Sequence, residues 1–252
     1  MSKPEAPRST AATDRSRHDA EPAFVLHAYP FRETSLIVES FTRHFGRVPL
    51  VAKGARRPKS AVRGMLLAFQ PLVVSWSGRS ELRTLVKAEW QGGLPPIGGL
   101  ALICGFYLNE LLLRLLPRDD PHEELFDYYR ETLARLAGQG APAPVLRRFE
   151  LRLLQELGYA VPLDHDADSG LGLDPDGQYA YVPERGPVSA GAAAPGTAVE
   201  LRGKTLLDMA RGEYADPVTL AQSKTLMRLL INHHLGGQPL HTRQLLKDLK
   251  EL

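Results

Sequence analysis

Residues 23–60 read AFVLHAYPFRETSLIVESFTRHFGRVPLVAKGARRPKS, with three runs that are rich in β-branched and aromatic residues. Pro30 to Glu33 separates the first run from the second, and a His-Phe-Gly corner separates the second from the third. Short runs of this composition, bounded by turn-forming residues, are typical of strands. The pattern predicts strands at 23–29, 34–42 and 47–53.

The next segment, residues 54–64, is basic and rich in turn-forming residues, and Ser60 is a suitable N-cap for one short helical turn. Two further strands are predicted at 69–76 and 81–90, joined as a hairpin through a Ser-Gly-Arg-Ser turn. Five short strands with a helical insertion after the third favour a small closed antiparallel barrel. The oligonucleotide-binding (OB) barrel has this order. An SH3-like barrel is the competing arrangement.

From Pro95-Pro96 onward the apolar residues recur at helical spacing. Pro117 ends the first of these helices, and Gly158 closes the third. Between the third and fourth helices lies a long segment, 159–203, which is rich in Gly, Pro, Asp and Ala and is predicted to be irregular. The predicted helices are at 100–116, 122–138, 144–158, 204–212, 218–237 and 242–252.

The predicted fold class is therefore α+β, with a five-stranded OB barrel followed by a mostly α-helical C-terminal domain. The first residues have neither apolar periodicity nor the apolar core of a signal peptide, and we interpret them as a disordered tail. The predicted division is a tail at 1–21, an OB barrel at 22–95, and a helical domain at 96–252 with an irregular insertion at about 159–203.

Charge is distributed unevenly along the chain. Eight Lys or Arg residues lie between Ser40 and Ser80, and this stretch contains no Asp or Glu. Residues 22–95 hold eleven basic and four acidic residues, whereas residues 96–252 hold 16 and 21. Ordinary soluble surfaces mix both signs. Because Lys and Arg supply most non-specific affinity for phosphates, the bias predicts that the first domain binds a nucleic acid.

Barrels of this kind bind single strands with a basic groove and with aromatic faces on which bases stack. The side chains predicted to bind the nucleic acid are Arg32, Arg43, Arg47, Lys53, Arg56, Arg57, Lys59, Arg63, Arg79, Arg83 and Lys87. The candidate stacking platforms are Tyr29, Phe31, Phe41, Phe45, Phe69 and Trp76, most of which alternation assigns to the core.

The sequence contains no motif for bond chemistry. It lacks a phosphate-binding G-x-x-x-x-G-K-[ST] loop, a G-x-S-x-G elbow and a His–carboxylate metal spacing, so we expect a non-enzyme without a cofactor. Cys104 lies in an apolar run and is expected to be a buried structural thiol. That run, Leu100 to Leu116, is interrupted by charged residues and is too short to span a bilayer comfortably. We expect a cytoplasmic protein.

Two clusters of possible metal ligands do not support a metal site. Asp164, Asp166 and Asp168 are spaced as in an EF-hand loop, but the sixth and twelfth positions are Ser169 and Pro175 instead of glycine and a carboxylate. A solvated acidic loop is the better interpretation. The pair His233-His234 is interpreted as a surface or helix-capping feature rather than a ligand pair.

Four separated segments resemble one known family. They are similar, in the same order, to segments of the RecO family of bacterial recombination mediators. The four segments are ETSLIVESFTRHFGRVPLVAKGARRPKS (33–60), FYLNELLLRLLP (106–117), LRRFELRLLQELGY (146–159) and HLGGQPLHTRQLL (234–246). The resemblance covers nearly all of residues 23–246. It implies an amino-terminal OB barrel, a helical carboxy-terminal domain, and a nucleoid-associated role in DNA repair and recombination.

The resemblance also implies partners. Members bind single- and double-stranded DNA, anneal complementary strands and, with RecR, help place RecA on strands coated by single-stranded DNA-binding protein. The acidic, hydrophobic tail of that protein is an expected ligand of the helical domain, and a basic and apolar helix is a suitable receptor. The candidate residues are Arg147, Arg148 and Leu151. In the competing interpretation Leu151 is core and the arginines pair with Glu150 or Glu131.

One feature departs from the family. Many members carry a four-cysteine zinc motif after the helix that ends in LGY, but the corresponding segment here contains no cysteine, so no zinc is expected. Two rival functions remain open at this point. An RNA-binding barrel of translation or ribosome assembly would use the same charge and fold. A pure adaptor would use its basic segment to bind an acidic protein surface.

Overall fold

The computed structural model describes residues 17–138, 140–194 and 196–248. Its first part is a closed barrel in which the strands lie in the order β1-β2-β3-β5-β4. Strands β3 and β5 close the barrel as a parallel pair, in which Leu50 lies opposite Arg83. The elements are β1 (Arg17–Phe31), β2 (Ser35–Thr42), β3 (Gly46–Ala52), α1 (Ala61–Met65), β4 (Leu72–Ser77) and β5 (Arg83–Trp90).

Alternating side chains of these strands fill the barrel. Val38, Leu50 and Trp76 are among the buried residues of its core, and Leu66, just after α1, is buried with them. Helix α1 lies between β3 and β4 in the chain, as predicted, and Ser60 is its N-cap residue, although its side chain makes no capping hydrogen bond. The strand order confirms the OB barrel and excludes the SH3-like alternative.

The first strand begins earlier than the sequence indicates. Residues 17–21 were assigned to the tail, but they belong to β1 and pair with β4, with Arg17 opposite Ser77 and Glu21 opposite Val74. The assignment to the tail was wrong for these five residues because backbone pairing at the barrel rim needs no apolar side chains. The remaining predicted tail, residues 1–16, lies outside the described residues.

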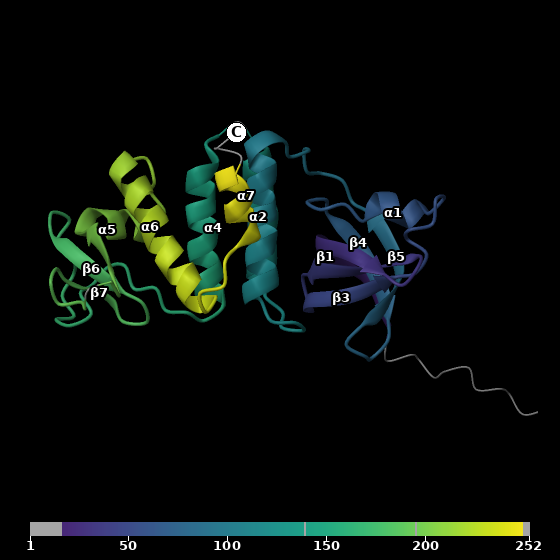
Figure 1. The fold of residues 1–252 in the computed structure, drawn as a ribbon, viewed down its shortest axis with the longest axis horizontal. Coiled ribbons are helices and arrows are strands. Elements are labelled where there is room, and N and C mark those ends of the chain that lie inside the picture. Colours follow the sequence, from purple (N-terminus) through teal and green to yellow (C-terminus); the bar gives the residue numbers. More distant parts are fainter. Residues whose placement is uncertain (1–16, 139, 195, 249–252) are drawn as a thin grey trace, which may run out of the picture.

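The second part is built from helices, and Figure 1 shows it extending from the barrel to a small sheet at the far end. Asn109, in the first helix of this second part, donates a hydrogen bond to the backbone carbonyl of Leu26 in β1, at 2.9 Å. Among the described residues no helix is long and apolar enough to cross a membrane. The helices are α2 (Gly99–Leu115), α3 (Glu123–Ala137), α4 (Pro142–Glu156), α5 (Gly203–Arg211), α6 (Pro217–His234) and α7 (His241–Asp248).

The barrel and the helices share one core. Phe24 and Phe41 project from β1 and β2 onto α3, where their rings lie 5.3 Å from the ring of Phe126. The ring of Phe24 also lies 5.1 Å from that of Tyr129. Cys104 of α2 is buried in the same core, as predicted, and burial raises the pKa of its thiol. Aromatic packing of this kind fixes the barrel against the helices.

The segment 159–203 is not wholly irregular. It contains a three-stranded antiparallel sheet in the order β7-β6-β8, and Tyr181, Val188 and Leu201 on its strands are buried. The prediction was wrong here because each strand has only four or five residues, which is too short for a periodic signal among so many Gly and Pro residues. The strands are β6 (Gln178–Val182), β7 (Gly186–Ser189) and β8 (Val199–Arg202).

In the acidic loop before this sheet, Asp166 and Asp168 interact with other residues of the protein. Asp166 accepts hydrogen bonds from the backbone amides of Asp168 and Ser169, and the Ser169 amide is the main cause of its lowered pKa. Asp168 pairs with Arg185. Within the described part of the chain, no group of three or more His, Cys, Asp or Glu residues is placed to hold a metal ion.

The paired histidines lie at the end of α6. His233 contacts Glu184 through Nε2 and Oε1 at 2.9 Å, and the ring of His234 stacks on that of Tyr159 at 3.7 Å. Both contacts join the end of α6 to the segment around the small sheet, which gives the histidines a structural role.

Replacing Gly46 with alanine is expected to destabilise the junction between the barrel and the helices. Gly46 has a φ of +65°, and a Cβ there would lie 1.9 Å from the carbonyl oxygen of Asp120. Left-handed strain together with a backbone clash should lower the free energy of unfolding by about 2 kcal/mol or more. Chemical denaturation measures the loss. Gly64→Ala is the control, since a Cβ at Gly64 meets nothing within 4 Å; an equal loss in both variants would contradict the argument.

Candidate nucleic-acid interface

The structure divides the eleven candidate cations of the barrel into two groups. Four form ion pairs with acidic side chains: Arg43, Arg47, Arg83 and Lys87. The other seven are exposed, and none has an acidic partner among the described residues. They are Arg32, Lys53, Arg56, Arg57, Lys59, Arg63 and Arg79.

Arg43 binds acids of the helical part. Its Nη1 lies 2.7 Å from Glu123 and its Nη2 lies 2.9 Å from Asp127, and both acids are on α3. The side-chain hydrogen bond with Asp127 is the largest cause of its raised pKa. Because both bonds are made to α3, Arg43 joins the barrel to the helices.

Arg47 lies in a buried network. It pairs at 3.2 Å with Glu39, which is 4 % exposed, and its Nε donates to the carbonyl of Leu116 at 3.0 Å. Arg118 also binds Glu39 and reaches Glu81. Burial is the main cause of the lowered pKa of Arg47.

Two more of the four cations have nearby acids. Arg83 of β5 pairs at 2.6 Å with Asp119, which lies between α2 and α3, and Lys87 pairs at 2.8 Å with Glu89 on its own strand. The acid-free stretch 40–80 is partly neutralised by outside acids through Arg43 and Arg47. For Arg43, Arg47 and Arg83 the ion pairs supply a structural role, which leaves these three less available to a nucleic acid than the sequence predicts.

The seven exposed cations lie on three connections of the barrel: the β1–β2 turn, the segment between β3 and β4 that contains α1, and the β4–β5 hairpin. Arg56 donates through Nη1 to the carbonyls of Arg32 and Glu33 at 3.4 Å, which holds the β3–α1 loop beside the β1–β2 turn. Arg32 has a φ of +52°, and its guanidinium lies 5.2 Å from the centre of the Phe31 ring. Arg79 lies in the β4–β5 hairpin. OB barrels bind nucleic acids with the β1–β2 and β4–β5 loops, so these positions suit a phosphate backbone.

Most of the candidate stacking rings are occupied in the core. Phe41, Phe69 and Trp76 are buried, and Phe45 packs on Trp76 at 5.3 Å. Tyr29 and Phe31 are half-buried and keep accessible surface. Trp90, which is 63 % exposed at the end of β5, was not among the predicted stacking platforms. Its neighbour Ala88 is buried, and strand alternation alone would have assigned Trp90 to the same inner face.

The candidate peptide-binding residues fall on two separate cavities. Arg147 lines a mainly apolar cavity of about 670 Å³ between α2, α4 and α6, together with Arg228 and Arg243. Arg148 and Leu151 line another cavity, of about 460 Å³. Arg148 donates to the carbonyl of Gly212 at 2.9 Å. The predicted trio therefore does not form one site.

Arg147 is part of a buried polar group at the first cavity. It is 8 % exposed and pairs with Glu150, which is 1 % exposed and accepts a hydrogen bond from Tyr107 at 2.6 Å. Burial is the largest cause of the raised pKa of Glu150, and it is opposed by Arg147. The Nε and Nη1 atoms of Arg147 have no hydrogen-bond partner. The alternative pairing with Glu150 is therefore present for Arg147, whereas Glu131 pairs with Arg135.

Arg243 is held at the same cavity by α7. The carboxylate of Glu110 on α2 accepts hydrogen bonds from the amides of His241 and Thr242, at 2.7 and 2.9 Å, and from the Thr242 hydroxyl. Burial raises the pKa of Glu110, but these hydrogen bonds outweigh it and hold the pKa below its ordinary value. The ionised carboxylate thus anchors the first turn of α7 on α2.

Comparison with known proteins identifies the family. The model "Recombination protein O N terminal" matches residues 19–93, which form the barrel, and "Recombination protein O C terminal" matches residues 99–244, which contain the helices. The chain belongs to the RecO family. The match confirms the resemblance seen in the sequence, and the OB barrel described above is the RecO N-terminal domain.

Similar RecO proteins match over nearly the whole chain. A DNA repair protein RecO of Nitrosospira multiformis is 59 % identical over 239 residues, covering 95 % of this chain and 99 % of the relative. A DNA repair protein RecO of Aromatoleum aromaticum is 57 % identical over 240 residues, covering 95 % of this chain and 100 % of the relative.

Proposed function

We propose that this RecO protein is a recombination mediator that binds DNA through the loops of its barrel and anneals complementary strands. Membership of the family gives it a role in DNA repair. With RecR, it assists the loading of RecA onto strands coated by single-stranded DNA-binding protein, at the nucleoid in the cytoplasm. The observation that carries the DNA-binding step is the group of seven exposed cations without acidic partners among the described residues, in which Arg56 holds the β3–α1 loop beside the β1–β2 turn.

The mechanism needs no bond chemistry, so we propose a non-enzyme that works without zinc or another cofactor. Two complementary strands repel each other through their phosphates. Cations that neutralise part of this charge on both strands lower the repulsion and release bound counterions, after which base pairing supplies the remaining free energy. Arg56 and Arg57 are central in this account because both are exposed in the β3–α1 loop.

The DNA-binding step is tested against the rival functions by measuring affinity for matched DNA and RNA oligomers by fluorescence anisotropy, across a salt series. We expect salt-dependent binding of DNA that is at least as tight as that of RNA. A clear preference for RNA would favour the RNA-binding barrel, and no binding of either oligomer at physiological salt would favour the adaptor.

We further propose that the 670 Å³ cavity receives the acidic, hydrophobic tail of single-stranded DNA-binding protein. Its apolar wall includes Leu100, Leu146 and Leu220, and Arg228 and Arg243 supply positive charge. Arg147 also lines this wall, but its unpartnered Nε and Nη1 atoms are buried, so the carboxylate is assigned to Arg228 and Arg243. An apolar residue followed by a terminal carboxylate matches this combination.

Replacing Arg228 with glutamine is expected to weaken binding of a synthetic tail peptide by about tenfold, because a charge-assisted hydrogen bond to the carboxylate is lost. Isothermal titration calorimetry with the full chain measures the change. The matched control is Arg148→Gln, which removes a cation at the other cavity and should leave the affinity unchanged. If Arg148→Gln weakened binding and Arg228→Gln did not, the peptide would bind at the second cavity.

A further inference from the structure

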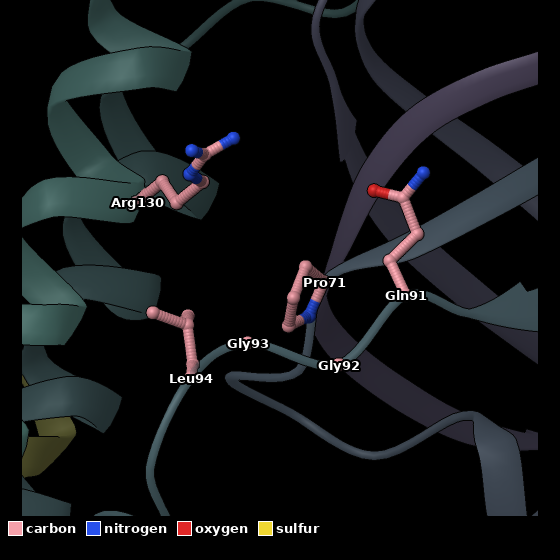
Figure 2. A pocket seen from close by; sticks show the side chains of 6 residues that line it. All are labelled: Pro71, Gln91, Gly92, Gly93, Leu94 and Arg130. Atoms are coloured by element: carbon pink, nitrogen blue, oxygen red, sulfur yellow. The ribbon is translucent and has the colours of Figure 1, made fainter.

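A third cavity lies where the barrel meets α3. It has a volume of about 300 Å³ and is lined by Pro71, Gln91, Gly92, Gly93, Leu94 and Arg130. Figure 2 shows Arg130 on one side, on its helix, with Gln91 on the opposite side and the two glycines on the chain that follows β5. None of the six lining residues is acidic. The cavity therefore suits an anionic ligand.

The charge of Arg130 is available to such a ligand. Arg130 is exposed on α3, and no ion pair joins it to an acid among the described residues. The acid nearest along its helix face, Asp127, is one turn away and is bound to Arg43 at 2.9 Å. A cation that lacks a carboxylate partner beside a cavity is suited to a phosphate.

Trp90 lies beside Gly92, one of the residues that line this cavity. A Cβ on Gly92 would lie 3.8 Å from the six-membered ring of Trp90, so the indole lies against the glycine backbone. The indole Nε1 donates to Gln70 at 3.1 Å, which fixes the ring although 63 % of the residue is exposed. An exposed aromatic face held in one position is a stacking platform for a base.

We propose that this cavity is a nucleotide site for single-stranded nucleic acid, in which Trp90 stacks on one base and Arg130 binds the adjacent phosphate. The inference rests on the proposed function and adds a contact outside the basic loops. Helix α1, which carries Arg63, packs against β5, the strand that ends at Trp90. Because stacking requires an unpaired base, the site distinguishes single strands from duplex.

Fluorescence gives a direct readout, since the chain has two tryptophans and the other, Trp76, is fully buried. Titration of the full chain with an oligothymidine strand is expected to quench the indole emission. Trp90→Phe should abolish most of the quenching while retaining most of the affinity. Quenching that persists in Trp90→Phe, or no quenching of the wild-type protein at saturation, would overturn the site.

Affinity measurements test the two contacts separately. Trp90→Ala should weaken binding of the oligothymidine strand by about tenfold and leave duplex and abasic strands unaffected. Arg130→Gln should reduce the salt dependence of single-strand binding by about 0.7 in the logarithmic slope, whereas Arg135→Gln on the same helix should not. Equal weakening for thymidine and abasic strands, or equal slopes for the two arginine variants, would contradict the proposal.

Failure of this site and failure of the proposed function give different results. If Arg56→Glu/Arg57→Glu loses affinity while Trp90→Ala keeps it, DNA binding stands and the nucleotide site falls. If the wild-type protein binds no oligomer, both fall together.

Discussion

Replacing Arg56 and Arg57 with glutamate is expected to weaken DNA binding by about a hundredfold at low salt. Both side chains are exposed, neither has an acidic partner among the described residues, and Arg56 is held beside the β1–β2 turn. The change removes two cations and adds two charges that repel phosphate. The logarithm of the affinity should also depend less steeply on salt, by a slope of about 1.4 for single strands.

The matched control is Arg135→Glu/Arg185→Glu, which changes the net charge by the same amount on the helical part of the chain. Both control residues are about half exposed. Fluorescence anisotropy with a labelled single strand measures all three proteins. If the control lost as much affinity as the test variant, only net charge would matter. If the test variant kept its affinity, the β3–α1 loop would not be the DNA-binding surface.

Replacing Arg147 with methionine is expected to lower the free energy of unfolding by about 3–5 kcal/mol. Glu150 is 1 % exposed, and without Arg147 its carboxylate would keep the hydrogen bond from Tyr107 as its only short contact. A buried charge without a partner is far more costly than a buried ion pair or a neutral group. Urea denaturation measures the loss.

The second variant, Arg147→Met/Glu150→Gln, should recover most of this stability, because the glutamine is uncharged and has nearly the same shape. The destabilisation caused by Arg147→Met should increase with pH. Burial raises the pKa of Glu150 and Arg147 lowers it, so the single variant has a still higher folded pKa. Its destabilisation should be small below the ordinary carboxyl pKa and grow as pH rises through the folded pKa. A loss that is independent of pH and not rescued by Glu150→Gln would contradict this account.

The barrel was predictable from the sequence because strand and turn signals are local. Gly46 at a corner and the Ser-Gly-Arg-Ser turn separate the strands, and α1 follows Ser60, as expected. The start of β1 at Arg17 was not predictable in the same way, because that part pairs through its backbone with β4 and carries polar side chains. The small sheet within 159–203 was missed because its strands are very short.

The candidate site was only partly predictable, because ion pairs join residues that are far apart in the chain. The stretch 40–80 has no acid of its own, yet its Arg43 meets Asp127, and Arg83, just beyond the stretch, meets Asp119. Composition reports charge without reporting such partners. The same limit applies to the adjacent residues Arg147 and Arg148, which helix geometry directs to different cavities. Composition therefore predicted the basic domain, whereas the ion pairs of its arginines follow only from the folded chain.

The most direct test of the central claim is the rate at which complementary oligonucleotides anneal when they are coated with the cognate single-stranded DNA-binding protein. The rate is measured with and without this protein, across a salt series. The account predicts faster annealing that declines as salt rises, since the barrel cations act by neutralising phosphates. No acceleration at any salt concentration, together with no binding of DNA, would contradict it and favour a protein adaptor.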